Sequence, residues 1–269
     1  MIDKRERLRT SPIGENISFS KYIGMVFEEP LILHHFAQKH QFYHWIEHLN
    51  SFERFLTEPV PNYSMKENFD AVKKLIISGL SDAGFTYQAY QLAAACDEDE
   101  LNNCIIKQYT EETPLYYQVN AELRNCHLLQ NEPITSDLEK YHNDLAPWIL
   151  QLNTAIRKRP SFEGKCFRGT RIDEDVLKLY KEKELFVWAP FVSASKCKEQ
   201  CFGGNVLFEI FTESAMSLND KRFPRDISGL SAFFEEQEVL LPIACAYRVH
   251  YIKEEGGLTI MGIATVDYN

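Results

Sequence analysis

The spacing of the hydrophobic residues changes near residue 160, and this change restricts the fold more than any other feature of the chain. Between about residues 65 and 160 the apolar residues recur at helical intervals. In the segment "NFDAVKKLIISGL" four of them share one predicted helix face: Phe69, Val72, Leu75 and Ile76. From about residue 165 onward the period becomes two, and β-branched and aromatic residues are frequent. Helices followed by strands indicate an α+β fold and not alternating βαβ units.

The same pattern predicts where the elements and the domain boundaries lie. Further helices are expected at "TPLYYQVNAELRN" and "DLAPWILQLNTAIRKR". Strands are expected at "KCFRG", "LFVWAPFVSAS", "NVLFEIF", "EVLLPI", "CAYRVHYI" and "LTIMGIATV". We therefore predict one domain over residues 63–269, with a helical lobe at 63–162 and a β core at 163–269. Residues 1–62 form a separate, predicted helical extension, which ends at the two prolines of "TEPVPNY".

Charge and composition disfavour several classes of partner. The formal net charge of −10 and the pI near 5.4 argue against nucleic acid or an anionic membrane as the main partner. The sequence has no apolar window of the roughly 18 residues that a spanning helix needs, so we expect no membrane insertion. The first residues, "MIDKRERLRTSPIGENIS", lack the apolar centre of a secretory signal. Seven cysteines without a CxxC pair fit free thiols in a reducing compartment, and we expect a cytoplasmic protein.

Histidines are concentrated near the N-terminus, but their pattern does not predict a metal site. His40, His44 and His48 fall at i, i+4 and i+8 and share a helix face. The run "HWIEH" does not match the HExxH pattern of zinc proteases, and the third histidine is too far along the axis to reach the same ion. We predict a packed or partner-facing helix there, and no metal.

Polar residues interrupt three of the predicted strands. Arg168 ends the first strand and is followed by Gly169, a pair that suits a phosphate and a close backbone approach. In "PFVSAS", an extended strand would place Phe191, Ser193 and Ser195 on one face. Considered alone, Arg168 is better explained as a surface arginine at a strand end, whereas the serines fit a polar cleft and a solvated edge strand equally well.

Three carboxylates precede the predicted strand "EVLLPI". In an extended segment Glu236 and Glu238 would share one face, while Glu235 and Gln237 would point to the other. Like charges this close repel one another, so their burial would be costly. An acidic turn in solvent is the simplest explanation for this segment alone.

Taken together, these polar segments resemble a known family. Arg168 in "FRG", Ser193 in "FVSAS", and Glu236 and Glu238 in "EEQEV" match, in order and spacing, the R-S-ExE signature of the arginine-specific mono-ADP-ribosyltransferases of the cholera-toxin-like class. The segments "SKCKEQCFGGNVLFEI", "DISGLSAFFEEQEVLLP" and "YTEETPLYYQVNAELR" are similar to neighbouring parts of that family, so the resemblance covers roughly residues 65–269. One departure is Ala194, where threonine is common; alanine keeps the alternating geometry.

The resemblance implies an ADP-ribosyltransferase fold, in which a helical lobe packs beside two small, roughly perpendicular sheets with a cleft for NAD. It implies that NAD is the co-substrate and that Glu238 stabilises the positive charge that develops as nicotinamide leaves. Ser193 would hydrogen-bond Glu238 and the nicotinamide ribose. Arg168 would anchor a phosphate or ribose oxygen, and the backbone of Gly169 would meet the carboxamide.

Further NAD contacts follow from the same resemblance. They would come from Thr170, Ser195 and Phe202, the last by stacking near nicotinamide. Tyr116 and Asn120, one helical turn apart, would brace the dinucleotide, although packing in the core explains them equally well.

Glu236 carries the expected specificity. In the resembled family a glutamate at this position accompanies arginine targets, whereas glutamine accompanies asparagine or cysteine targets. Here position 236 is glutamate and the glutamine is at 237, so the motif implies an arginine acceptor.

The sequence therefore predicts an NAD-dependent enzyme that transfers ADP-ribose to arginine on a target protein. Two alternatives stay open: an NAD glycohydrolase that uses the same residues, and a non-catalytic module that binds NAD or a partner. The resemblance also implies a bacterial toxin or effector as one origin, delivered into a host cell, and an intracellular enzyme as the other. Residues 1–62 are a candidate docking element for the target.

Overall fold

The protein is described here by a computed structural model, which covers residues 65–125, 136–183, 185–188, 190–201, 203–212, 223–243 and 245–266. The helical extension predicted over residues 1–62, with its histidines, lies outside these residues. Phe202 also lies outside them.

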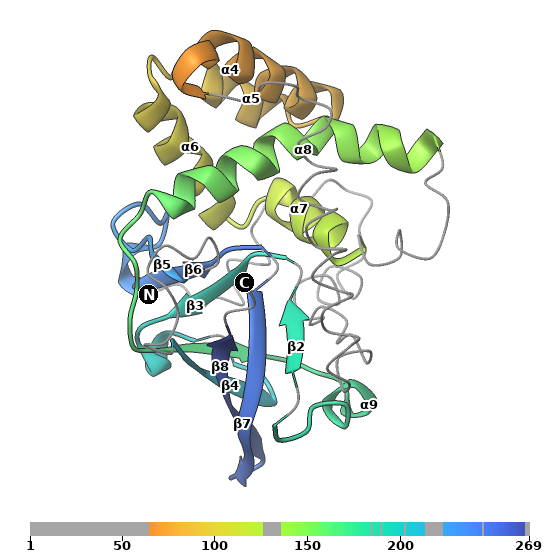
Figure 1. The fold of residues 1–269 in the computed structure, drawn as a ribbon, viewed down its shortest axis with the longest axis vertical. Coiled ribbons are helices and arrows are strands. Elements are labelled where there is room, and N and C mark those ends of the chain that lie inside the picture. Colours follow the sequence, from red (N-terminus) through yellow and green to blue (C-terminus); the bar gives the residue numbers. More distant parts are fainter. Residues whose placement is uncertain are drawn as a thin grey trace.

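The N-terminal part of the described chain is a helical lobe, as the helical period predicted. Its helices are α4 (Met65–Asp82), α5 (Thr86–Ala93), α6 (Glu98–Thr110), α7 (Pro114–Asn125) and α8 (Ser136–Arg157). They stack on one end of the strands (Figure 1). On α4, Val72 and Ile76 are buried as expected, and Phe69 is partly buried against the same core. The prediction for Leu75 was wrong: this side chain is 37% exposed and points away from the helical core.

Buried amides fix α6, whose last residues reach the pocket described below. The Gln108 side chain donates to the carbonyl oxygen of Gln88 on α5 at 2.9 Å. It also accepts from the indole nitrogen of Trp148 on α8 at 3.1 Å. Because a buried amide is costly to leave unpaired, these bonds define the position of α6 between its two neighbours.

The second part is an eight-stranded sheet in the order β2-β7-β8-β4-β1-β3-β6-β5. The strands are β1 (Lys165–Thr170), β2 (Leu185–Trp188), β3 (Val192–Ser195), β4 (Val206–Phe211), β5 (Arg225–Asp226), β6 (Glu238–Leu241), β7 (Cys245–Glu255) and β8 (Leu258–Val266). Among the described strands, β4 and β8 pair in parallel and the other pairs are antiparallel. A short helix, α9 (Glu174–Leu177), follows β1. The predicted α+β class is confirmed.

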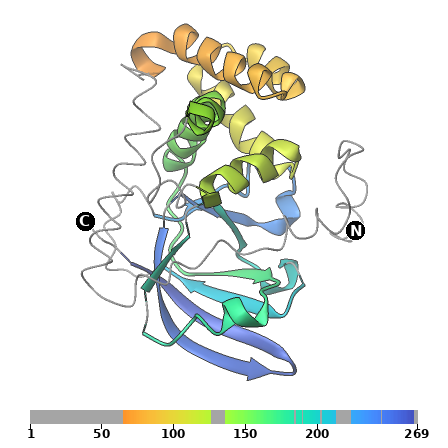
Figure 2. The same cartoon turned by 90° about the vertical axis from the view of Figure 1, so that its right-hand side faces the viewer.

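The two sheets expected from the resemblance are the two halves of this one sheet. Strands β1 and β3 join at a single register pair, Phe167 and Ser195, whereas β1 pairs with β4 along its whole length. Beyond this narrow junction β3, β6 and β5 run across the direction of β7 and β8 (Figures 1 and 2). The change in direction leaves a space between the junction and the helical lobe.

One strand prediction was wrong in a way that matters for the site. The segment "LFVWAPFVSAS" was expected as one strand, but it forms β2 and β3, which are separated around Pro190. β2 pairs with β7 at one edge of the sheet, while β3 pairs with β1 and β6. Proline cannot donate a main-chain hydrogen bond to a neighbouring strand. It therefore fits the break between β2 and β3, where the chain crosses from one half of the sheet to the other.

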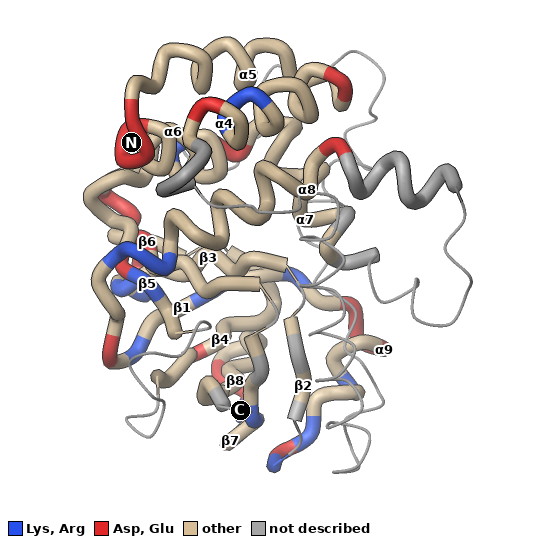
Figure 3. The backbone as a smooth tube through the Cα atoms, turned by 45° about the horizontal axis from the view of Figure 1, so that its top comes forward, with Lys and Arg blue, Asp and Glu red and all other residues tan. Residues whose placement is uncertain are grey.

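Charged residues of both signs are interspersed over the described helices and strands (Figure 3). None of the described helices is both long and apolar enough to cross a membrane.

Candidate active site

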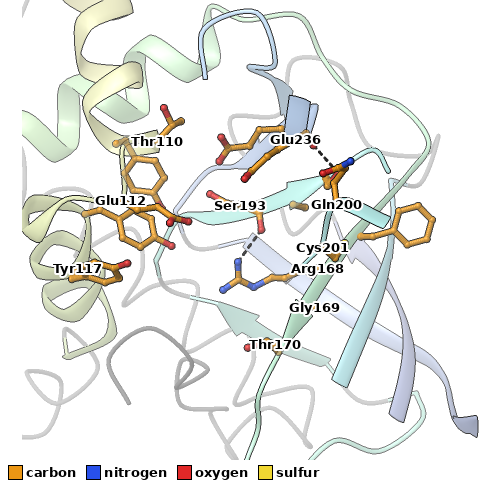
Figure 4. A pocket seen from close by; sticks show the side chains of 16 residues that line it. Thr110, Glu112, Tyr117, Arg168, Gly169, Thr170, Ser193, Gln200, Cys201 and Glu236 are labelled. Atoms are coloured by element: carbon orange, nitrogen blue, oxygen red, sulfur yellow. Dashed lines mark hydrogen bonds between the residues drawn. The ribbon is translucent and has the colours of Figure 1, made fainter. Parts of the chain in front are cut away.

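A pocket lies between the helical lobe and the junction of β1 with β3. Its empty space is about 740 Å³, including the part open to solvent. It is lined by the end of α6, the turn into α7 and α7 itself, and by β1, β3 and the start of β6. The charged side chains among the described lining residues are Arg168 and three carboxylates, those of Glu112, Glu236 and Glu238. The pocket therefore combines one cationic side chain with three carboxylates, Glu112 on the side of the helical lobe and Glu236 and Glu238 on the side of the strands (Figure 4).

Strand β1 supplies the cationic side of the pocket. Arg168 donates from Nη1 to the main-chain carbonyl oxygen of Ser193 at 2.8 Å, which ties β1 to β3 beside their narrow junction (Figure 4). Gly169 and Thr170 follow on the same strand and also line the pocket. The predicted residues Arg168, Gly169, Thr170 and Ser193 are thus brought together.

The close approach of the chain at Gly204 keeps the end of β1 in place. A Cβ atom at this glycine would lie 1.8 Å from the main-chain oxygen of Thr170, so no other residue fits without a shift of the backbone. The next residue, Asn205, forms two hydrogen bonds with the main chain of Ile172, at 2.9 and 2.7 Å. These contacts fix the backbone next to the pocket.

Ser195 holds the turn that carries the glutamates. Its hydroxyl oxygen lies 2.7 Å from the carbonyl oxygen of Glu236 and 2.9 Å from that of Cys197, and it accepts from the Cys197 N–H at 2.9 Å. Ser195 lines the pocket but is only 6% exposed. The geometry gives it a structural role, and its predicted contact with NAD stays a prediction.

The two glutamates line the same pocket, but not through the strand geometry that was expected. Glu236 ends a short 3₁₀ helix, η4 (Phe234–Glu236), and Gln237 adopts a left-handed conformation with φ of 47°. β6 begins only at Glu238. The assumption of a continuous extended segment was therefore wrong, because the left-handed residue reverses the chain between the two carboxylates. Glu235 and Gln237 are exposed and do not line the pocket.

Glu238 is bound by a residue that the sequence analysis did not single out. The hydroxyl of Ser231 donates to Glu238 Oε2 at 2.8 Å. Glu238 is 6% exposed, whereas Glu236 is half-buried. The hydrogen bond that was expected from Ser193 to Glu238 stays a prediction; Ser193 faces Leu240 in the β3–β6 register, and Ser195 faces Glu238.

Aromatic residues of the helical lobe form the opposite wall. Tyr109 is fully buried, and its ring packs against Tyr116 at 4.9 Å and Phe191 at 5.4 Å between centroids. Burial raises the pKa of Tyr109 well above its ordinary value, and Tyr116 and Glu238 act in the same direction. Its hydroxyl lies 3.1 Å from the Nδ2 of Asn120 and 3.3 Å from the carbonyl oxygen of Phe191. Tyr109 therefore stays uncharged and supports this wall of the pocket through its packing.

Of the two residues predicted to brace NAD from α7, only one lines the pocket. Tyr116 does so, next to Tyr117. Asn120 is 3% exposed and is hydrogen-bonded to Tyr109, which matches the alternative of packing in the core. Other lining residues were not predicted: Thr110, Glu112, Gln200 and Cys201. Glu112 has a φ of 53°, a left-handed conformation that is uncommon for residues other than glycine.

An ion pair supports the glutamate loop from behind. Lys196, directly after β3, contacts Asp226 of β5 at 2.6 Å, and the Ser228 hydroxyl donates to the same carboxylate at 2.6 Å. Burial alone would raise the pKa of Asp226, but the bonds from Lys196 and Ser228 hold it below its ordinary value. The carboxylate is therefore ionised at neutral pH, and the pair links the start of the loop to the residue that follows β3.

Among the residues that the structure describes, no three histidine, cysteine or acidic side chains are grouped so as to hold a metal ion. The histidines between positions 34 and 48 lie outside this part of the chain, so their predicted lack of a metal stays a prediction.

Comparison of the sequence with known proteins gave two curated relatives, and no protein family model matches the chain. A Mycobacterium avium protein provisionally named NAD(+)–arginine ADP-ribosyltransferase Mav is 31% identical over 102 residues, which cover 36% of this chain and 11% of Mav. A Vibrio splendidus protein provisionally named NAD(+)–arginine ADP-ribosyltransferase Vis is 26% identical over 130 residues, which cover 46% of this chain and 51% of Vis. The chain thus matches about half the length of Vis and about a tenth of Mav.

Two solved structures share the fold. The ADP-ribosyltransferase HopU1 of Pseudomonas syringae has a TM-score of 0.51 at 20% identity, over 72% of this chain and 87% of HopU1. The ADP-ribosyltransferase Vis in complex with an inhibitor has a TM-score of 0.50 at 21% identity, over 77% of this chain and 88% of Vis. The chain therefore has the ADP-ribosyltransferase fold, as the resemblance implied.

Proposed function

We propose that this protein is an NAD-dependent mono-ADP-ribosyltransferase that modifies arginine side chains of a target protein and releases nicotinamide. The observation that carries the proposal is the convergence of four residues from three separate segments on one pocket: Arg168, Ser193, Glu236 and Glu238. The names of the two curated relatives support the same activity.

The charges of the pocket fit NAD in one orientation. The diphosphate is anionic, and Arg168 is the cation among the described lining residues, so the diphosphate side of NAD belongs near β1. The nicotinamide ring of NAD is cationic and belongs toward the carboxylates of Glu236 and Glu238. Gly169 and Thr170 lie beside Arg168 and offer backbone and hydroxyl contacts to the same ligand.

Glu238 would assist the departure of nicotinamide. As the bond between the ribose C1′ and the nicotinamide nitrogen breaks, its electron pair leaves with nicotinamide and C1′ becomes an oxocarbenium-like centre. A fixed carboxylate near the ribose stabilises this developing cation, because it is already ordered before the reaction. Burial of Glu238 strengthens the interaction, since little water screens it.

Glu236 would bind the acceptor. An arginine guanidinium is protonated at neutral pH and is a poor nucleophile until a carboxylate orients it and accepts a proton. Glu236 lines the pocket and is half-buried, so it can contact an incoming side chain from solvent. A guanidinium nitrogen then forms the new bond to C1′, and its proton passes to the carboxylate or to solvent.

Hydrolysis of NAD would require the same first step, with water as the acceptor. The pocket is open to solvent, which makes this side reaction accessible when no target is bound. Release of nicotinamide from NAD should be measured with and without agmatine, an arginine analogue, in the wild type and in Glu238→Gln. We expect release that agmatine increases, an ADP-ribosylated product, and loss of both in the variant. Release that agmatine leaves unchanged would favour a glycohydrolase, and no release even with cell extract would favour a binding module.

We further propose that the protein acts in a reducing cytoplasm, either where it is made or in a host cell into which it is delivered. No cysteine in the described part of the chain forms a disulfide, which supports such a compartment. The proposed docking role of residues 1–62 is tested by deleting residues 1–60. Unchanged target choice in extracts would contradict that role.

A further inference from the structure

The loop that precedes the glutamates binds Glu238 at two points. The Ser231 hydroxyl donates to its carboxylate at 2.8 Å. The N–H of Ile227 donates to its main-chain carbonyl oxygen at 3.1 Å. Because both bonds come from the same short loop, the position of the loop sets the position of the carboxylate.

The Ser231 hydroxyl is itself fixed. Its oxygen accepts from the N–H of Phe233 at 3.2 Å, which leaves its proton free to point at Glu238. The main-chain N–H of Ser231 donates to the carbonyl oxygen of Ile227 at 3.0 Å and closes the turn. A hydroxyl held from two sides loses little freedom when it donates, so the bond to Glu238 is preorganised.

The helical lobe holds the loop from the opposite side. The N–H of Ala232 donates to the Thr110 hydroxyl at the end of α6 at 2.9 Å, and the same hydroxyl donates to the carbonyl oxygen of Lys107 at 2.9 Å. Thr110 is 4% exposed. The bond connects residues 122 positions apart, so the loop beside Glu238 is anchored to the lobe that forms the other wall of the pocket.

We propose that Ser231 is a positioning residue for the reaction: it aims the carboxylate of Glu238 into the pocket and stabilises its ionised form, while Thr110 holds the loop that carries it. The expected effect of Ser231 on catalysis rests on the proposed function. Its effect on the position of the Glu238 carboxylate rests on the hydrogen bonds alone. Ser231 is not among the residues that line the pocket, so it acts through Glu238.

Ser231→Ala tests this role. The kcat for nicotinamide release should fall about 10- to 100-fold, because the variant lacks a hydrogen bond to the charged carboxylate of Glu238. The KM for NAD should change little, because the diphosphate contacts are intact. Loss of the donor disfavours the ionised carboxylate, so the acid limb of the pH–rate profile should move to higher pH. Ser231→Thr keeps the hydroxyl and should restore both properties.

The control is Ser81→Ala, which removes a hydroxyl that donates to the carbonyl oxygen of Ile77 on the exposed side of α4. It should leave kcat and the pH profile unchanged. Thr110→Val should lower kcat in the same direction as Ser231→Ala, since the loop loses its anchor. A Ser231→Ala variant with unaltered kcat, or a loss confined to the KM for NAD, would overturn the proposal.

A second measurement is independent of activity. Carboxyl-carbon NMR of glutamate-labelled protein, with Glu238→Gln for assignment, gives the titration midpoint of Glu238. The midpoint should rise in Ser231→Ala relative to Ser81→Ala and return in Ser231→Thr. If the wild type released no nicotinamide, the proposed function would fail, and an unchanged midpoint would still separately refute the bond to Ser231.

Discussion

Glu236→Gln should separate transfer from hydrolysis, because the two reactions share every step except the choice of acceptor. The substitution removes the charge of a half-buried side chain but keeps its size and a carbonyl oxygen that accepts hydrogen bonds. Glu238 and its bond from Ser231 are not changed. The cleavage of the nicotinamide bond should therefore survive, while binding and activation of a guanidinium should not.

The expected size of the effect follows from the exposure of the site. Two unit charges 4 Å apart interact by about 4 kcal/mol at the effective dielectric constant of about 20 that suits a site near the surface. Desolvation of the guanidinium offsets part of this, and hydrogen bonds to charged groups are worth about 1.5–3 kcal/mol net. A loss of about 2 kcal/mol corresponds to roughly 30-fold in kcat/KM for agmatine. If the Glu236 carboxylate also accepts the guanidinium proton, the substitution removes this proton acceptor and the loss in kcat/KM for agmatine is larger.

The assay follows nicotinamide release and ADP-ribosyl-agmatine formation in the same sample, over a range of agmatine concentrations. Hydrolysis in Glu236→Gln should stay within about threefold of the wild type, since the group that stabilises the oxocarbenium is intact. The matched control is Glu235→Gln, which makes the same change one residue earlier, at an exposed position that does not line the pocket. It should leave both reactions unchanged.

Two results would refute this division of roles. Equal losses of hydrolysis and transfer in Glu236→Gln would show that Glu236 acts on NAD and not on the acceptor. An equally large loss of transfer in Glu235→Gln would show that the acceptor is not bound by Glu236 alone.

Three other perturbations test separate parts of the site. Glu112→Gln should raise the KM for agmatine about three- to tenfold, since it removes one of the three carboxylates that line the pocket. Glu111→Gln, just outside the pocket, should not, and equal effects would exclude a local contact. Gly204→Ala should lower the free energy of unfolding by roughly 3 kcal/mol or prevent folding, because its Cβ would meet a main-chain oxygen at 1.8 Å; an unchanged melting temperature would contradict the close approach. Asp226→Asn should cost about 1 kcal/mol or less near neutral pH through loss of the ion pair with Lys196. The pKa of Asp226 is lowered in the folded protein, so this stability is present above the ordinary pKa near 4 and is lost as pH falls through the lower folded pKa. Unfolding free energies of the two proteins should therefore converge in acid, and a constant difference would argue against an ionic contribution.

The sequence predicted the order of the elements well, because periodicity depends on which side of an element faces the core. The helical and strand halves meet where the period changed, and Val72 and Ile76 are buried as the pattern requires. The pattern failed where local spacing does not determine burial. Leu75 falls within the predicted helix face, yet the neighbouring helices do not cover it.

Sequence analysis named residues that line the pocket, but not the geometry by which they meet. Glu236 and Glu238 were placed on one face by assuming an extended backbone, which the left-handed Gln237 rules out. The sequence "EEQE" does not indicate that Gln237 has a positive φ, since glutamine rarely adopts one. The turn is held from outside, by the hydroxyl of Ser195 on the Glu236 carbonyl oxygen and by the N–H of Lys196 on that of Gln237. Such contacts between distant segments have no signal in local spacing.

Ser231 and Thr110 show the same limit more clearly. Each is an ordinary polar residue at the end of a predicted element or in a loop, and each gains its role only through a partner supplied by the fold. The bond from Ala232 to Thr110 depends on the placement of α6, which in turn depends on the buried amide of Gln108. We therefore expect a side chain in the helical core to influence the orientation of Glu238 through three successive sets of hydrogen bonds, those of Gln108, Thr110 and Ser231. The helical lobe therefore forms one wall of the pocket and also positions the loop that orients the Glu238 carboxylate. Substitutions inside the lobe should thus affect kcat as well as stability.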